Sequence, residues 1–463
     1  MARGLQFSQL AGASLAEIDI RTEALHELST LVRTGWFTVK NLNSIATVST
    51  TVLLLAGLAS AQAVFTALPV PGSSPNSPIS VNNSGLVLVN TADSSSYQIS
   101  VWNRLGGAQA VGLVGGNSGG ADINSAGDVV GSADPDNTGY LQSFFWQPSS
   151  GAQWLGSLGG NLSAANGLND SGSVVGFSYN SANYQHAFYW TQSGGLQDLT
   201  PDLTSLGGAT ALAINSSNQV VGYYFPNGSR TTLGFAWTPA GGFQNIGASG
   251  TLAFALNDAG TVVGQSTFAN GNRHAFSWTP ASGVRDLGTL GGESSATGIN
   301  ALGWIVGSSL TSATKSLVHG FLWTPTGGIQ DLSTLAGLSA NIQTTAAQAN
   351  DFGVIAVSTT KGGYLLVPKM TATFSSSANP SLQGQAVTFT ATLTSIVGPP
   401  PDGDTVQFSL GSTILGSGTL EGGVAQFTTS SLAAGSHAIT ATFSGDSNYL
   451  PTKYKSFTQV VNP

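Results

Sequence analysis

The chain of 463 residues lacks cysteine entirely, and only 7% of its residues are charged. Without cysteine there is no disulfide framework, no thiolate metal site and no cysteine nucleophile. The 13 Lys and Arg residues form no cluster, whereas the 21 Asp and Glu residues bring the net charge to −8. Because nucleic-acid phosphates demand clustered Lys and Arg, this composition predicts no nucleic-acid partner.

Long hydrophobic runs are also missing. The apolar run at residues 52–58 is too short for a membrane span, but it follows Arg33 and Lys40 and precedes Ala61-Gln62-Ala63, small residues that a signal peptidase accepts. Residues 1–63 are therefore predicted to be a leader and secretory signal, and its removal leaves no stable membrane span. Residues 1–32 are either an extended leader or precede the true start. The mature protein is expected to be secreted or held at the cell surface.

What the chain has in abundance is a repeat. Segments of the form Ile-Asn-x-x-Gly-x-Val-Val-Gly return in steps of 42 to 50 residues, and we call their asparagine the marker. The markers are Asn82, Asn124, Asn169, Asn215, Asn257, Asn300 and Asn350. A period of about 40 to 50 residues is typical of solenoids and propellers, in which each unit buries its apolar faces against its neighbours.

Each repeat predicts four short strands. In residues 209–247, small or Val-rich runs alternate with turn signals, and no helical period intervenes. Four antiparallel strands per unit make a propeller blade, so residues 64–368 are predicted to form a seven-bladed β-propeller. The seventh unit lacks a fourth strand, and we expect residues 64–70 to supply it by pairing with residues 363–367.

Aromatic and histidine residues recur within the third strand. With a strand period of two, the aromatic pair of His-Ala-Phe-x-Trp shares one face and is expected to fill the core between blades. The pairs are Phe144 and Trp146, Phe188 and Trp190, Phe235 and Trp237, Phe276 and Trp278, and Phe321 and Trp323. His186, His274 and His319 should lie on a ring around the axis, too far apart to share a metal ion, so each is expected to bond within its own blade.

These motifs, together with Asp-Leu-Gly-Thr-Leu-Gly-Gly at 286–292, resemble the HAF family of probable extracellular bacterial repeats over residues 65–368. The resemblance implies a secreted repeat protein without assigned catalytic residues. Residues 370–463 resemble a bacterial Ig-like domain, through Thr371-Ala372-Thr373-Phe374 and the segment 443–449. Turn signals every 8 to 12 residues there also predict an Ig-like β-sandwich, and such domains usually serve as spacers or adhesive modules.

Catalysis finds little support in the sequence. The small-residue strand before each marker should line the axis, and the residues two before six of the markers are Asp122, Gly167, Ala213, Ala255, Gly298 and Gln348. One carboxylate in that ring cannot supply a two-carboxylate hydrolase. No metal or cofactor is expected, and a polysaccharide-active enzyme is the least favoured alternative.

The loops between second and third strands favour binding instead, because they vary while the hairpin turns do not. They share one face, where Tyr140, Tyr179, Tyr184, Arg230 and Arg273 are the candidate ligand-binding residues. Uncharged polar groups with scattered aromatics suit a neutral polysaccharide or a surface protein. The prediction is a non-enzymatic extracellular binding or adhesion module, and a purely structural matrix or spacer protein is the alternative.

Overall fold

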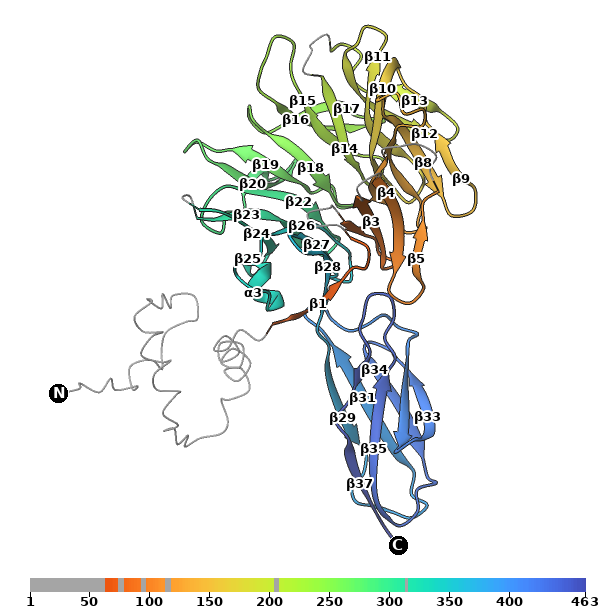
Figure 1. The fold of residues 1–463 in the computed structure, drawn as a ribbon. Helices are drawn as coiled ribbons and strands as arrows, with labels where there is room; N and C mark the ends of the chain where they lie inside the picture. The colour runs from red at the N-terminus through yellow and green to blue at the C-terminus, as the bar shows by residue number, and fades with distance from the viewer. Residues whose placement is uncertain (1–62, 74–78, 93–96, 113–117, 204–207, 313–314) are drawn as a thin grey trace, which may run out of the picture. The chain divides into compact units, whose positions relative to one another are not determined.

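A computed structural model describes residues 63–463 apart from 74–78, 93–96, 113–117, 204–207 and 313–314 (Figure 1). The predicted signal lies outside the described residues except for Ala63. The described part is all-β apart from one short helix, α3 (Leu332–Ala336). None of its helices is long and apolar enough to cross a membrane.

Seven four-stranded antiparallel sheets, one for each marker asparagine, are formed by the described residues. We call them blades 1 to 7. Blades 1 to 3 comprise β2 (Ile79–Val81), β3 (Leu86–Ala92), β4 (Tyr97–Asn103) and β5 (Gly107–Ala110); β6 (Ser118–Ile123), β7 (Val129–Ala133), β8 (Gln142–Gln147) and β9 (Gly151–Trp154); and β10 (Gly159–Leu168), β11 (Val174–Asn180), β12 (Gln185–Thr191) and β13 (Gly195–Asp198).

The remaining blades have the same strand order. Blades 4 to 6 comprise β14 (Ala209–Ile214), β15 (Val220–Tyr224), β16 (Leu233–Thr238) and β17 (Gly242–Ile246); β18 (Leu252–Leu256), β19 (Val262–Thr267), β20 (Arg273–Thr279) and β21 (Gly283–Asp286); and β22 (Ser294–Ile299), β23 (Ile305–Ser312), β24 (Lys315–Thr324) and β25 (Gly328–Asp331). Blade 7 comprises β26 (Thr344–Ala349), β27 (Ile355–Thr359), β28 (Gly362–Pro368) and β1 (Phe65–Pro69).

The two ends of the repeat region meet in blade 7, as the sequence predicts. Strand β1 pairs antiparallel with β28, from Phe65 opposite Pro368 to Pro69 opposite Tyr364. Phe65 is 1% exposed and packs with Leu366 and Ile355 of the same blade. Since β1 is the outer strand, Pro69 stands at an edge, where a missing N–H is tolerated.

Two glycine positions explain why the repeat motif takes this shape. Gly127 ends the marker turn of blade 2 with φ +86°, and Asn218 takes the same role in blade 4 with φ +59°. Gly176 lies in the second strand, where a Cβ would collide with the backbone oxygen of Ala164 and stand 2.9 Å from Cε1 of Phe188. A side chain there would thus separate the inner strand from the aromatic core.

The aromatic pairs of the third strands form the predicted core and lie in clusters that span neighbouring blades. All five phenylalanines of these pairs are 0% exposed. Four of the five tryptophans are buried as well, with exposed fractions of 4% for Trp146, 4% for Trp190, 6% for Trp278 and 7% for Trp323. Trp237 departs from the prediction, because it is only half-buried.

The direction in which each aromatic side chain points follows from the strand period. Trp278 of blade 5 packs in one cluster with Ala236 of blade 4, which precedes it. Phe145 of blade 2 contacts Trp190 of blade 3 with ring centroids 5.8 Å apart, and Tyr189 of blade 3 contacts the tryptophan of blade 4 at 5.6 Å. The residue between Phe and Trp therefore faces the following blade, whereas the Phe and Trp of each pair face the preceding one.

Helix α3 is the one element that the repeat pattern does not predict. It follows the outer strand of blade 6, where Asp331 caps its first turn by accepting a hydrogen bond from the Ser333 backbone N–H at 2.7 Å. Gly337 ends it in the left-handed conformation, φ +66°. Because Leu332 and Ala336 are buried beside blade 7, the helix covers part of that blade's core.

Residues 371–462 form the predicted Ig-like β-sandwich. One sheet has the order β29-β31-β34, and the other β30-β37-β35-β32-β33, with β36 paired to β35. The strands are β29 (Thr371–Ser376), β30 (Ser381–Leu382), β31 (Val387–Thr394), β32 (Thr405–Leu410), β33 (Thr413–Thr419), β34 (Val424–Thr429), β35 (Gly435–Phe443), β36 (Thr452–Lys453) and β37 (Phe457–Asn462). Phe389, Phe408 and Phe443 are buried between the sheets.

Candidate functional site

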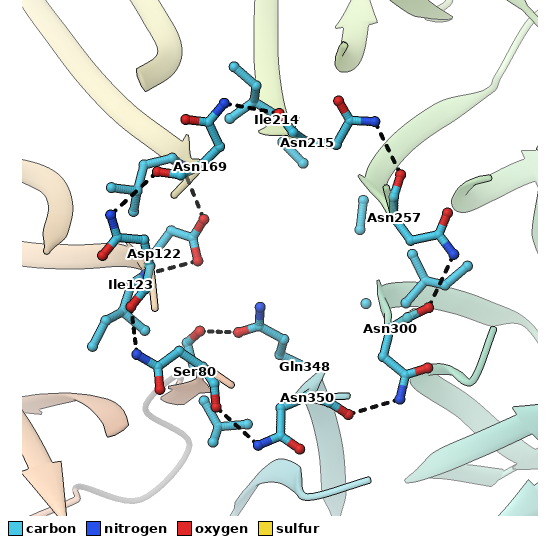
Figure 2. Close-up of a pocket in the computed structure, with 18 of the residues that line it drawn as sticks. Ser80, Asp122, Ile123, Asn169, Ile214, Asn215, Asn257, Asn300, Gln348 and Asn350 are labelled. Carbon is cyan, nitrogen blue, oxygen red and sulfur yellow. Dashed lines mark hydrogen bonds between the residues drawn. The ribbon is translucent and has the colours of Figure 1, made fainter. Parts of the chain in front are cut away.

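The marker asparagines form a closed ring of hydrogen bonds that joins all seven blades (Figure 2). Each Nδ2 donates to the backbone oxygen of the next marker, and Asn350 completes the circle by donating to Asn82 at 3.0 Å. The other six distances, from Asn82 onward, are 2.5, 3.4, 3.0, 3.2, 3.1 and 2.8 Å.

Each marker side chain also stabilises its own turn. Its Oδ1 accepts the backbone N–H four residues ahead, at 2.8 to 3.0 Å in all seven blades. The seven asparagines are only 3–8% exposed, so an unmade hydrogen bond here would be costly. The sequence gives no signal for the contact with the next blade, because turn chemistry alone accounts for an asparagine at this position.

A second set of contacts joins blades just outside this ring. Asp170 accepts from the Ser125 backbone N–H at 2.8 Å, and Asp351 accepts from that of Ala301 at 2.7 Å. Asp258 accepts from the Ser216 N–H at 2.9 Å in the same way. These aspartates directly follow a marker, and their carboxylates are engaged with the backbone of the preceding blade.

The inner strands and the asparagine ring enclose a cavity of about 400 Å³. Its wall is polar on one side, where Ser80 hydrogen-bonds Gln348 and Asp122 lies nearby (Figure 2). On the other side, Ala213 and Ala255 present little beyond backbone. Of the residues predicted to line the axis, Gly167 is the one that does not border this cavity.

Asp122 is a buried titratable group that lines this cavity. Its two carboxylate oxygens accept the backbone N–H groups of Ile123, at 2.9 Å, and Leu168, at 3.1 Å. Burial raises the pKa of Asp122 to about 6, against the lowering effect of these two hydrogen bonds, and the nearby charge of Asp170 raises it further. Asp170, Asp258 and Asp351 also border the cavity, so it holds more carboxylates than the sequence indicates.

The three repeat histidines each bond an aspartate of their own blade. The Nδ1 of His186 lies 2.7 Å from Oδ2 of Asp198, and the pairs His274/Asp286 and His319/Asp331 are 2.8 and 2.7 Å apart. Among the described residues no group of three potential ligands could hold a metal ion. The sequence carries a signal for these pairs, because an aspartate follows 12 residues after each histidine, while the blades with Gln98, Gln142 or Leu233 lack it.

The candidate ligand-binding residues lie on successive blades from 2 to 5. Tyr140 is 50% exposed in the loop before β8, and Arg230 is exposed in the loop before β16. Tyr179 and Arg273 belong to strands β11 and β20 rather than to loops, which are shorter here than predicted. Tyr184 is half-buried beside its turn. None of these five side chains lines the axial cavity.

Comparison with known families assigns the C-terminal sandwich to a family. Residues 372–462 match the bacterial Ig-like domain (group 3) model. Curated protein sequences contain no match to the chain.

Solved structures to which the chain is similar include the extracellular domain of the hybrid two-component system BT3049 from B. thetaiotaomicron, at 11% identity and a TM-score of 0.42. The alignment covers 86% of this chain and 58% of that domain. TolB from Acinetobacter baumannii is 12% identical with a TM-score of 0.38, over 53% of this chain and 61% of TolB. The chain thus spans less than two thirds of either protein, and such low identities support no transfer of function.

Proposed function

We propose that the chain is a secreted, non-enzymatic binding module that recognises a neutral polymer or a surface protein through the loop face of its propeller. The observation that carries the proposal is the exposed Tyr140 in the polar loop before β8 of blade 2, with Arg230 and Arg273 exposed at the corresponding ends of blades 4 and 5. A planar aromatic ring offers a large contact area, and amide and hydroxyl groups around it fix orientation. Export is supported by the predicted signal at residues 41–63 and by the Ig-like domain, a type that usually serves at cell surfaces.

We further propose that the repeats belong to the HAF type. The support is the order in which the marker segment and the Phe-x-Trp pair recur in blades 2 to 6, with the full His-Ala-Phe-x-Trp motif in blades 3 and 5. This assignment implies an extracellular repeat protein and adds no catalytic residue.

Binding is favoured over catalysis because the carboxylates that line the cavity are hydrogen-bonded to the backbone. Both oxygens of Asp122 accept backbone hydrogen bonds, and Asp170, Asp258 and Asp351 each hold the backbone of the preceding blade. A general acid or base must be free to exchange a proton with substrate. Carboxylates in these positions serve blade packing first.

The test is binding of the full-length protein to a panel of soluble neutral polysaccharides, such as β-glucan, xylan, mannan and dextran. Exchanging the loops at residues 134–141 and 225–232 for Gly-Ser segments of equal length should abolish saturable binding. The matched control exchanges the turn at residues 239–242, which lies at the opposite end of the strands of blade 4. Binding that survives the loop exchange would place the ligand on another surface of the protein. If the unchanged protein binds neither the panel nor any surface protein of the producing cell, the spacer alternative is favoured. Turnover of a panel polysaccharide would favour an enzyme.

A further inference from the structure

Blade 2 departs from the repeat at several positions of one face. In blades 3 to 6 the outer strand places Leu196, Phe243, Val284 or Ile329 opposite the tryptophan of the third strand. In blade 2 the residue opposite Trp146 is Ala152. The outer strand then ends in Trp154, at the position where Asp198, Asp286 and Asp331 pair with histidines in blades 3, 5 and 6. Gln142 stands in place of the histidine.

This face of blade 2 is turned toward blade 1. Phe144 and Trp146 pack in one cluster with Leu88, Ile99 and Val101 of that blade. Ala152 and Trp154 share the face of Trp146 and Phe144, with which they pair. The departures from the repeat therefore fall along a single seam between blades 1 and 2.

A groove of about 340 Å³ opens at this seam. Trp146, Val101 and Pro148 give it apolar walls, whereas Asn103 and Gln109 supply amide groups. No charged residue lines it. Two small side chains leave the space open. Ala152 stands opposite Trp146 where blades 3 to 6 have a bulky residue, and Val101 stands where blades 2 and 3 place an aromatic ring against the next tryptophan.

Another seam shows what a tryptophan in this position accommodates. Between blades 5 and 6, Arg285 lies with its guanidinium 5.1 Å from the ring centroid of Trp323. Arg285 is the counterpart of Gln109, since both are the third residue of an outer strand. At the seam of blades 1 and 2 the shorter, neutral Gln109 leaves a groove beside Trp146.

An exposed ring extends the groove along β9. Trp154 is 37% exposed and stands about 7 Å along the strand from Ala152, two residues at the usual rise. Its indole packs against the buried ring of Phe144, with centroids 6.5 Å apart and planes at 85°. An exposed indole offers a flat apolar surface to the C–H face of a sugar ring.

We propose that the seam between blades 1 and 2 binds a short stretch of a neutral polysaccharide. One sugar ring occupies the groove beside Trp146, within hydrogen-bonding reach of the amides of Asn103 and Gln109, and another stacks on Trp154. The groove volume falls within the range of about 300–1,000 Å³ typical of small-ligand sites, and its uncharged lining suits a neutral ligand. This inference rests on the proposed function, for which it names a ligand class and a second binding surface.

The test uses the full-length protein and the same polysaccharide panel. Ala152→Phe, which copies Phe243 of blade 4, should fill the groove, and Trp154→Ala should remove the stacking surface; each is expected to weaken binding at least about tenfold. The matched controls are Leu196→Phe, at the position of Ala152 in blade 3, and Phe243→Ala, an exposed outer-strand aromatic of blade 4. Both controls should bind within about twofold of the unchanged protein. Thermal unfolding of each variant identifies any that does not fold.

Gln109→Ala, with Gln153→Ala as its counterpart in blade 2, provides a milder pair should Ala152→Phe fail to fold. Its expected effect is a threefold to tenfold loss, about one hydrogen bond. If the loop exchange abolishes binding while Ala152→Phe, Trp154→Ala and Gln109→Ala bind normally, the groove is excluded and the proposed function stands. If the unchanged protein binds no panel polysaccharide, the groove and the polymer form of the proposed function are both overturned.

Discussion

Asn257 offers the sharpest test of the asparagine ring. Its Nδ2 donates to the backbone oxygen of Asn300 at 3.1 Å, and its Oδ1 accepts from the backbone N–H of Thr261 at 3.0 Å. The residue is 8% exposed. Replacing it by aspartate preserves the shape and the acceptor for the turn but places an oxygen against the Asn300 carbonyl. Asn257→Asp therefore removes the contact between blades and spares the turn.

The expected loss of unfolding free energy at neutral pH is about 2–4 kcal/mol, since a buried acceptor loses its donor and meets a negative charge instead. Protonation of the new carboxyl restores a donor. The difference from the unchanged protein should therefore shrink as the pH falls from neutral toward about 4, because a destabilised buried carboxylate takes up its proton at a higher pH than an aspartate of the unfolded chain. Asn257→Ala, which removes both hydrogen bonds, should lose a similar amount without recovery in acid.

Urea unfolding followed by tryptophan fluorescence measures these differences, because the chain has nine tryptophans. Asn270→Asp in an exposed loop of the same blade is the matched control, as its Oδ1 bonds only the nearby Asn272 N–H. Asn270→Asp should lower the unfolding free energy by less than about 0.5 kcal/mol. If the two aspartate variants unfold alike at neutral pH, or if Asn257→Asp shows no recovery in acid relative to its control, the contact between blades does not stabilise the ring.

Three further predictions concern the core and the titratable groups. Phe276→Ala should lower the unfolding free energy by about 3–5 kcal/mol in urea titrations, whereas the half-exposed Phe243 should lose less than half of that on the same change. Because the pKa of Asp122 is raised in the folded state to about 6, the folded state binds the extra proton, and stability should fall as the pH rises from about 4 to about 6. Asp122→Asn should remove about 1–3 kcal/mol of that fall, and an unchanged pH profile would contradict the assignment. His319→Gln should lower the unfolding free energy by about 1–3 kcal/mol, because the His319 ring bonds both Asp331 and the Ala340 oxygen. The half-buried His437, whose ring bonds the Ala433 oxygen, should lose less on the same change, and equal losses in thermal unfolding would argue against the His319 bridge.

The architecture of the propeller was readable from the sequence because its causes are local or periodic. Turn residues at fixed offsets require positive φ, and Gly127 and Asn218 adopt it. A strand period of two placed Phe and Trp on one face, which the blades bury. The missing fourth strand of the last repeat and the spare strand at residues 64–70 predicted how the ends pair. Helix α3 was not foreseen, since its five residues are too few for a helical period to emerge.

The contacts between blades were decided by the tertiary structure alone. The amide of each marker asparagine satisfies its turn and also reaches a carbonyl 42 to 50 residues away, or 268 residues back at the closure. No local pattern specifies such a partner, because turn chemistry would select asparagine in any case. Ala152 and Trp154 are visible as departures from the repeat, yet their meaning depends on which neighbour their face meets. The groove becomes visible only when blade 2 packs against blade 1, because the side chains of both blades together set the size of the space between them.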